Sequence, residues 1–463
     1  MKALTSARIV ALSIAAVASI SVVASSAAAQ GTSSAARSSA ADTITFDEAI
    51  NIALRQNAVL KQSENASAMS ASVVSSKKQA FLPTLNISTN TAQTLGRNFN
   101  QAEGRIVDQT TSTLNTGLSS SITLFDGMRN VSALREAQLD QDASSSDLAR
   151  ARQTTVFTVA SDFLTLVKAQ EQLRIQRENL VALEAQEAQI QKFVAAGTRA
   201  ISDLYQQQAA TASARSAVVA AQRDVELGKI GLMQTLQLDP RGTYQFATPS
   251  VATDAGPETI QLDSLLERAF AHRTDLAAEQ SRVSAASQAV KGASGSKLPT
   301  VSLSVGYSTA FSSATDLGLA EQLNQRRGGS VGIGVSFPLF DRGATSIATQ
   351  QAQLQADNAR LALENQRQAI GLEVRRAYLD YETARQQLAA TQAQQKAADL
   401  AVTTTQKRYE LGSSTLLELT QARAAQLQAA SAVVSARFTV AFQKAAMSYY
   451  AGDLEAGSAS IGG

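Results

Sequence analysis

The 463-residue sequence contains no cysteine, no tryptophan and a single histidine, His272. The missing cysteine excludes disulfides, thiol catalysis, thiolate metal sites and a lipidated N-terminal cysteine. Neither a G-x-S-x-G nor a Walker A motif occurs in the chain. Residues 328–334 are glycine-rich, but they lie in a strand-like pattern and do not open a helix. We therefore expect no enzyme activity, no cofactor and no bound metal ion.

An excess of charge of one sign is also missing, since 41 Lys and Arg face 39 Asp and Glu without a basic block. This balance gives no support for nucleic-acid binding. The N-terminal segment carries Lys2 and Arg8, then an apolar run, then three alanines before Gln30. That order predicts a secretory signal peptide at 1–29. A membrane anchor is the alternative, but the apolar run is short for a bilayer span.

Proline is absent where helix-forming residues are densest. Residues 343–410 are rich in Ala, Gln, Leu, Glu and Arg, which predicts one helix about 100 Å long at about 1.5 Å per residue. Within it, apolar residues recur at alternating steps of four and three: Ile370, Val374, Ala377, Tyr381, Ala384 and Leu388. This spacing is the seam of a coiled coil, so the helix needs partner helices along its length.

One order of elements occurs twice. The LPT at 82–84 returns at 298–300, and the LFD at 124–126 returns at 339–341, so both motifs recur at nearly the same shift along the chain. A shift that holds over so long a stretch indicates a duplication. The first repeat is expected at 44–238, with strands at about 84–96 and 115–125, a long helix at 127–195 and a return helix at 202–236. The second is expected at 261–452, with strands at about 300–311 and 330–340, a long helix at 343–410 and a return helix at 414–450. A flexible lead-in at 30–43, a connector at 239–260 and a short polar tail at 453–463 complete the chain.

The expected strands alternate apolar residues with Ser, Gly and Asn. We expect these side chains to face lipid: Leu85, Ile87, Ile122, Leu124, Val301, Leu303, Val305, Tyr307, Val331, Ile333, Val335 and Phe337. Such alternation over about ten residues is typical of outer-membrane barrel strands, and a soluble sandwich with one buried face is the alternative. Four strands cannot close a barrel, so the barrel must be shared: two chains would supply eight strands and three would supply twelve. The long helices then have to cross an aqueous compartment, which the signal peptide indicates is the periplasm.

Together these features resemble the TolC family of outer-membrane efflux channels over essentially the whole mature chain. The resemblance is carried by the paired LPT motifs, by LFDG at 124–127 and FPLFDRG at 337–343, and by FVAAGT at 193–198 and RYELGS at 408–413. It implies a mostly α fold with a small β part. Four strands per chain would contribute to a shared barrel of twelve strands in a homotrimer, continued by a long α-helical coiled-coil tunnel.

The resemblance also implies a function and partners. The chain would be the outer-membrane exit duct of a tripartite export system that passively conducts drugs, small molecules or proteins. Its partners would be a periplasmic adaptor, an inner-membrane transporter of the RND or ABC type, and the lipid of the outer membrane. A periplasmic or surface coiled-coil protein with a structural or adhesive role and no pore is the alternative, but such a protein has no need of four alternating strands between its helix pairs.

In this family the tunnel closes at the periplasmic helix tips through Tyr, Arg and Asp side chains. The resemblance marks four gate candidates: Arg199, Asp203, Tyr409 and Glu418. Ser414 occupies a position that is usually Arg, and Gln421 replaces a second acidic residue. For the carboxylates, capping of a helix start is the alternative role, and for Tyr409 it is packing.

The turns at the same tips are the second group of candidate residues. They are Gly197, Thr198, Gly412 and Ser413, which the resemblance assigns to contact with the adaptor. The two glycines permit the left-handed backbone that reverses a helix pair.

Overall fold

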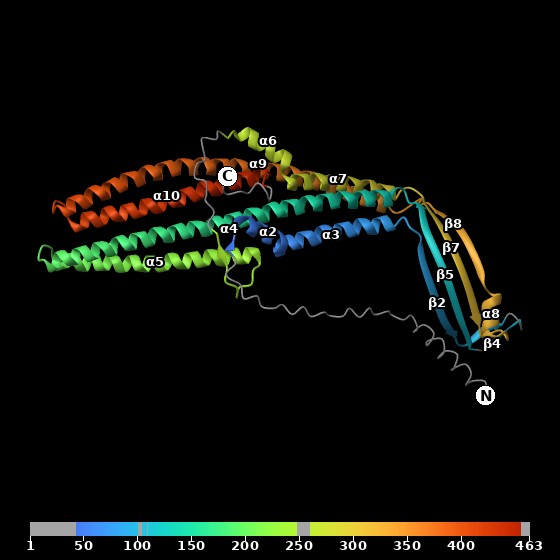
Figure 1. Cartoon of the computed structure of the whole chain (residues 1–463). Helices are drawn as coiled ribbons and strands as arrows, with labels where there is room; N and C mark the ends of the chain where they lie inside the picture. Colours follow the sequence, from blue (N-terminus) through green and yellow to red (C-terminus); the bar gives the residue numbers. More distant parts are fainter. Residues whose placement is uncertain (1–42, 101–103, 109, 248–259, 455–463) are drawn as a thin grey trace, which may run out of the picture. The chain divides into compact units, whose positions relative to one another are not determined.

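The computed structural model describes residues 43–100, 104–108, 110–247 and 260–454 (Figure 1). The expected signal peptide, most of the lead-in, most of the connector and the end of the polar tail lie outside these residues. The described chain is mostly helical with a small β part, so the expected fold class is confirmed. None of the helices in these ranges carries a stretch apolar enough to span a bilayer.

Eight of the described helices form four pairs of equal length, with one member from each half of the chain. The pairs are α2 (Phe46–Gln56) with α6 (Leu262–His272), α3 (Ala58–Gln79) with α7 (Thr274–Gly295), α4 (Arg129–Ala195) with α9 (Ala344–Glu410), and α5 (Ile201–Leu236) with α10 (Leu416–Ala451). Helices α4 and α9 have 67 residues each, which is about 100 Å of helix. Helix α5 packs along α4, α10 packs along α9, and α10 also contacts α4 (Figure 1).

Each long helix begins after a left-handed turn at the end of the sheet. In the first turn Gly127 and Met128 have φ of 74° and 69°, so α4 starts at Arg129, slightly later than the sequence predicts. Asp126 caps it by accepting a hydrogen bond from the Asn130 amide at 2.9 Å. Because Gly127 packs directly against Gly295 at the end of α7, a side chain at either position would clash with the other's carbonyl group.

The second turn repeats this arrangement. Asp341 accepts from the amides of Gly343 at 3.0 Å and Thr345 at 2.8 Å. The pKa of Asp341 is lowered, first by a hydrogen bond from the Thr345 side chain and then by the hydrogen bond from the Thr345 amide. The sheet therefore passes into both long helices through the same capped turn.

The main sheet has the strand order β2-β5-β7-β8 and is antiparallel throughout. Its strands are β2 (Thr84–Thr94), β5 (Thr111–Phe125), β7 (Thr300–Ser312) and β8 (Gly328–Ser336). The register aligns the apolar residues of neighbouring strands: Ile87 with Leu118 and Tyr307, Ile122 with Leu303 and Ile333, Val305 with Val331, and Val301 with Val335. The opposite face carries Ser, Thr, Gly and Asn, as in the row Asn86, Ser119, Gly306 and Ser330. Strands β2 and β8 are the two edges of this sheet.

Two of the residues expected on the apolar face deviate from the alternation. The register shifts between Thr123 and Phe125, so Phe125 lies opposite Val301 and Leu124 is the extra residue of a bulge. Phe337 lies outside β8, which ends at Ser336 and not near 340 as the sequence predicts. The next residue, Pro338, has no N–H to donate to a ladder, which explains the early end.

Several short elements were not expected from the sequence. Strand β1 (Thr43–Ile44) pairs in parallel with β6 (Gln245–Phe246), so residues from the end of the lead-in and the start of the first repeat form a small sheet with residues of the connector. Between β2 and β5 the chain forms a hairpin of β3 (Arg97–Asn100) and β4 (Arg105–Asp108), and a short helix, α8 (Leu319–Gln325), lies between β7 and β8. Ile44 and Phe246 are buried with Phe163 of α4 in the largest apolar core, where α2 and α5 also pack.

A buried polar cluster connects α7 to α9. The side chain of Arg273 is 3% exposed and donates to Asp275 at 2.8 and 2.6 Å and to Glu373 at 2.9 Å. Nearby, Arg150 of α4 donates to the Tyr449 carbonyl of α10 at 3.1 Å and lies over the Tyr449 ring. These contacts join α7 to α9 and α4 to α10, and the Arg273 guanidinium is largely removed from water.

We expect Arg273→Ala to lower the free energy of unfolding by about 3 kcal/mol, because it leaves the carboxylate of Asp275 buried without its cation. Burial raises the pKa of Asp275, whereas the hydrogen bonds and the charge of Arg273 lower it. The lowering effects together are larger, so the pKa of Asp275 lies below the ordinary 3.8. This stabilisation is therefore complete above pH 3.8 and is lost as the pH falls through the lowered pKa of Asp275. Thermal unfolding of the detergent-solubilised protein between pH 3 and 7 measures both effects.

The control is Arg360→Ala, which removes an exposed ion pair with Asp357 and should change stability by less than about 1 kcal/mol. Equal losses in the two variants, or a loss at Arg273 that does not shrink in acid, would contradict the role of the cluster.

Candidate functional site at the helix tips

The two helix reversals at the tips have the same backbone geometry. Gly197 follows α4 with φ of 74°, and Gly412 follows α9 with φ of 75°. The amide of Thr198 donates to the Phe193 carbonyl at 2.9 Å, and the equivalent bond in the second tip closes the turn at 2.8 Å. This is the Schellman arrangement, in which a left-handed residue lets the last carbonyls of a helix find donors.

The four candidate contact residues all lie in these turns and are exposed. The hydroxyls of Thr198 and Ser413 also donate to the carbonyls of Phe193 and Arg408, at 2.9 and 3.1 Å. They therefore stabilise the turns whether or not they touch a partner. Leu411, which directly precedes Gly412, is 83% exposed. Its apolar side chain lies at the end of the pair formed by α9 and α10.

A single arginine connects the two tips. The Arg199 guanidinium lies 4.4 Å from the centroid of the Tyr409 ring and donates a 2.9 Å hydrogen bond to the Tyr409 carbonyl. Tyr409 is 4% exposed and packs with Ile190, Leu416 and Leu419. Because Arg199 belongs to the first tip and Tyr409 to the second, the contact holds the two helix pairs of one chain together.

The Tyr409 hydroxyl makes no hydrogen bond within the described part of the chain. Burial raises its pKa, the charge of Arg199 lowers it, and Asp203 raises it again. Asp203 is therefore close enough to act on Tyr409 electrostatically without bonding to it. Of the gate candidates, the structure brings Arg199 and Tyr409 into contact and leaves Asp203 beside them.

Glu418 makes hydrogen bonds to two neighbouring residues at the start of α10. Its amide donates to the Thr415 hydroxyl at 3.2 Å, and its carboxylate accepts from the buried Ser414 hydroxyl at 2.5 Å. These are the contacts of a capped helix start, the alternative that the sequence left open for the acidic candidates.

The duplication explains why the tie between the tips is one-sided. Arg199 and Ser414 occupy equivalent positions in the two repeats, as do Val194 and Tyr409. At the first pair of positions only the first tip has an arginine, and at the second pair only the second tip has an aromatic ring. The sequence contains both residues, but the stacking of one on the other could not be predicted from positions 210 residues apart.

Among the residues that the structure describes, no three His, Asp or Glu side chains gather where they could hold an ion.

Comparison with known proteins identifies the family. The family model for outer membrane efflux proteins matches residues 16–236 and 265–452. The outer membrane efflux protein BepC of Brucella suis is 25% identical over 387 residues, covering 83% of this chain and 80% of BepC. The outer membrane protein TolC of Vibrio cholerae is 24% identical over 359 residues, covering 75% and 77%.

Solved structures agree with this assignment at the level of the fold. The crystal structure of CusC superposes with a TM-score of 0.77 at 18% identity, covering 89% of this chain and 93% of that one. The expected resemblance, the outer-membrane location and the role in export are thereby confirmed. The chain belongs to the outer membrane efflux protein family and serves as an exit duct in the outer membrane.

Proposed function

We propose that three copies of this chain assemble into one duct, and that a periplasmic adaptor and an inner-membrane transporter of the RND or ABC type deliver substrate to it. The relatives named as outer membrane efflux proteins and TolC support this assignment. The observation that carries it is the four-stranded sheet, which has one apolar face and two open edges.

The sheet supports assembly through its edges. A strand edge in lipid leaves backbone groups unpaired at several kcal/mol each, so β2 of one subunit has to pair with β8 of the next. The apolar face is strongly exposed in the single chain, as at Ile87 (78%) and Val331 (74%), which fits contact with lipid. The opposite face of Ser, Gly and Asn fits a water-filled interior.

The helices support the same seam. Packing of α3 on α4, α4 on α7 and α7 on α9 follows the strand order, so α3 and α9 lie at the two ends of the series. Ile347, Leu354 and Leu361 repeat every seven residues along α9 and are more than half exposed. A heptad stripe of this kind requires a partner helix, and exposed Val59 and Met69 make α3 of a neighbouring subunit a suitable one.

The helix tips support a gate. Arg199 holds the two tips of one subunit together, and it supplies the guanidinium that the position of Ser414 lacks. Asp203 and Glu418 bring acidic groups to the same end, where a ring of carboxylates would favour cations. The exposed turns at Gly197, Thr198, Gly412 and Ser413 are the surface that we assign to the adaptor.

The proposed seam can be tested by cross-linking, because the natural chain has no cysteine. Met69 of α3 and Leu354 of α9 lie about equally far from the sheet ends of their helices. We expect Met69→Cys with Leu354→Cys to yield covalent dimers and trimers with a short bismaleimide in membranes. The matched control pairs Leu354→Cys with Val181→Cys, which is exposed on α4 but distant from the sheet. Cross-linked species in the control alone, or only monomers in both, would refute the α3–α9 seam.

The gate can be tested by single-channel recording in planar bilayers. Arg199→Ala removes a cation–π contact and a charge-assisted hydrogen bond, together about 1–2 kcal/mol per subunit and about 3–6 kcal/mol over three subunits, so we expect the ratio of open to closed channels to rise at least about a hundredfold. Tyr409→Phe keeps the ring and the carbonyl and loses only an unpartnered hydroxyl, so it should remain closed. Closed Arg199→Ala channels, or Tyr409→Phe channels as open as Arg199→Ala, would rule out the proposed tie.

A further inference from the structure

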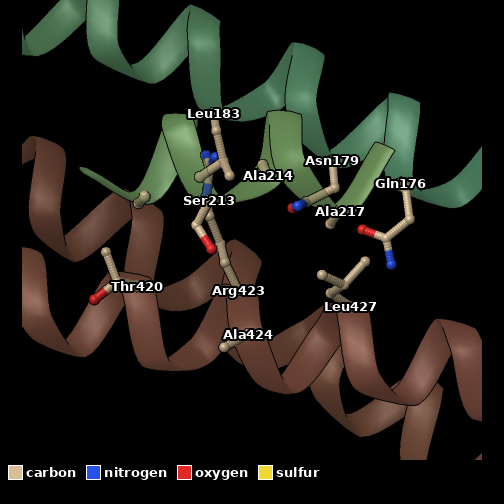
Figure 2. Close-up of a pocket in the computed structure, with 11 residues that line it drawn as sticks. Gln176, Asn179, Leu183, Ser213, Ala214, Ala217, Thr420, Arg423, Ala424 and Leu427 are labelled. Atoms are coloured by element: carbon tan, nitrogen blue, oxygen red, sulfur yellow. The ribbon is translucent and has the colours of Figure 1, made fainter. Parts of the chain in front are cut away.

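Arginines without an acidic partner in the described ranges occur both near the tips and at the sheet. One is Arg423, which extends toward α5 across a groove of about 260 Å³ between the helix pairs (Figure 2). That groove belongs to the end that we assign to the adaptor. Two others, Arg326 and Arg327, lie between α8 and β8, at the end of the sheet away from the long helices (Figure 1). These two have no part in the proposed seam or gate.

Helix α8 contacts the apolar face of the sheet. The Thr309 hydroxyl of β7 donates a hydrogen bond to the Leu323 carbonyl of α8 at 2.7 Å. Alternate residues of a strand share a face, so Thr309 belongs to the same face as Tyr307. The buried Gln322 side chain also holds α8 to the end of β7, through hydrogen bonds with the backbone of Ser312. Helix α8 therefore lies on the side of the sheet that we assign to lipid.

The two arginines follow α8 directly, and both are exposed. Continued by one residue, the pairing of Gly328 with Ser308 brings Arg327 opposite Thr309, on the apolar face. Neither Arg326 nor Arg327 forms an ion pair with a carboxylate of the described residues. Two guanidinium groups are therefore available to a ligand outside the chain.

Positive charge gathers at one end of α8. The acidic residues of this loop, Asp316 and Glu321, lie before the helix and in its first turn, whereas both arginines follow its last residue. The carboxylates and the guanidinium groups are thus separated by the length of the helix. The arginine end is the one that continues into β8 and its row of apolar side chains.

The height of Arg327 on the sheet matches the outer edge of the apolar band. Arg327 precedes Val335, near the helix end of β8, by eight residues. This is about 27 Å of strand, and about 21 Å along the membrane normal at a tilt of about 40°, where the apolar band of such barrels is about 25 Å tall. At the same level, one row of the apolar face carries hydroxyl groups instead, at Thr89, Thr116 and Thr309. The arginine pair therefore lies at the level of the lipid headgroups.

We propose that Arg326 and Arg327 bind the phosphate groups of an anionic lipid in the outer leaflet of the outer membrane. The inference rests on the proposed function, because it requires the apolar face of the sheet to contact lipid. A guanidinium binds phosphate through two parallel N–H donors, and an anionic membrane surface attracts each positive side chain beside it. Leu317 and Leu319, at the start of α8, are exposed apolar side chains that fit the adjoining acyl chains. A lipid is held by these chains as well, which a free phosphate ion lacks.

The test measures binding of lipid A, a phosphorylated glycolipid, to the detergent-solubilised trimer by native mass spectrometry. We expect the wild type to bind it at least about tenfold more tightly than the same lipid without its phosphates. Arg326→Gln with Arg327→Gln removes both charges from exposed positions, so this preference should fall below about twofold with the trimer intact. The matched control is Arg215→Gln with Arg223→Gln, which removes the same charge from exposed positions on α5 and should leave the preference unchanged.

The possible results separate the phosphate site from the function on which it rests. If the wild type binds both forms of the lipid equally, or if the Arg326 and Arg327 double variant keeps the preference, the arginines do not hold lipid phosphate. Binding of inorganic phosphate alone with the affinity of the lipid would identify a free-anion site and overturn the proposal. So would a double variant that falls into monomers before lipid is added, because the arginines would then serve the contact between subunits. A wild type that binds neither form and stays soluble without detergent would contradict the lipid-facing sheet, and with it the proposed duct.

Discussion

Backbone hydrogen bonding at the two sheet edges is the constraint on which the rest of this structure depends. Strands β2 and β8 each present one unpaired side, and lipid offers no donors or acceptors to satisfy it. A single chain therefore cannot complete a wall in a membrane, however well its own residues pack. The helices show the same need for a neighbour, because α3 and α9 expose apolar side chains that no described helix of this chain covers. Both features are understandable if the subunit is a segment of a closed ring, as we propose.

The turns between the sheet and the long helices make the helices follow the order of the strands. An aspartate caps each long helix, and left-handed residues directly before the helix set its direction. At Gly127 and Gly295 the two backbones approach so closely that neither position has room for a side chain. Because the turn is rigid, the order of strands becomes the order of helices. Farther along, the contacts of Arg273 join α7 to α9, and those of Arg150 join α4 to α10.

At the tips, duplication produced two turns with one backbone and different side chains. The glycine and the Schellman bonds are the same in both, because a helix reversal of this kind requires them. The side chains diverged, so that Arg199 lies over Tyr409 while the equivalent Ser414 bonds to Glu418. The asymmetry gives each subunit an internal tie between its two tips, which is the contact that we propose to open with the gate.

The long helices and the apolar face of the strands were predictable from the sequence alone, because each depends on residues close together in the chain. The duplication was also visible there, because the same motifs recur in the same order. Periods of two and of three to four residues are local properties, and so are the glycines that end α4 and α9. Three features became visible only in the folded chain: the bulge at Leu124, the pairing of β1 with β6, and the stacking of Arg199 on Tyr409. Each of these depends on which distant segments meet, and a local pattern carries no information about a partner in a remote part of the chain.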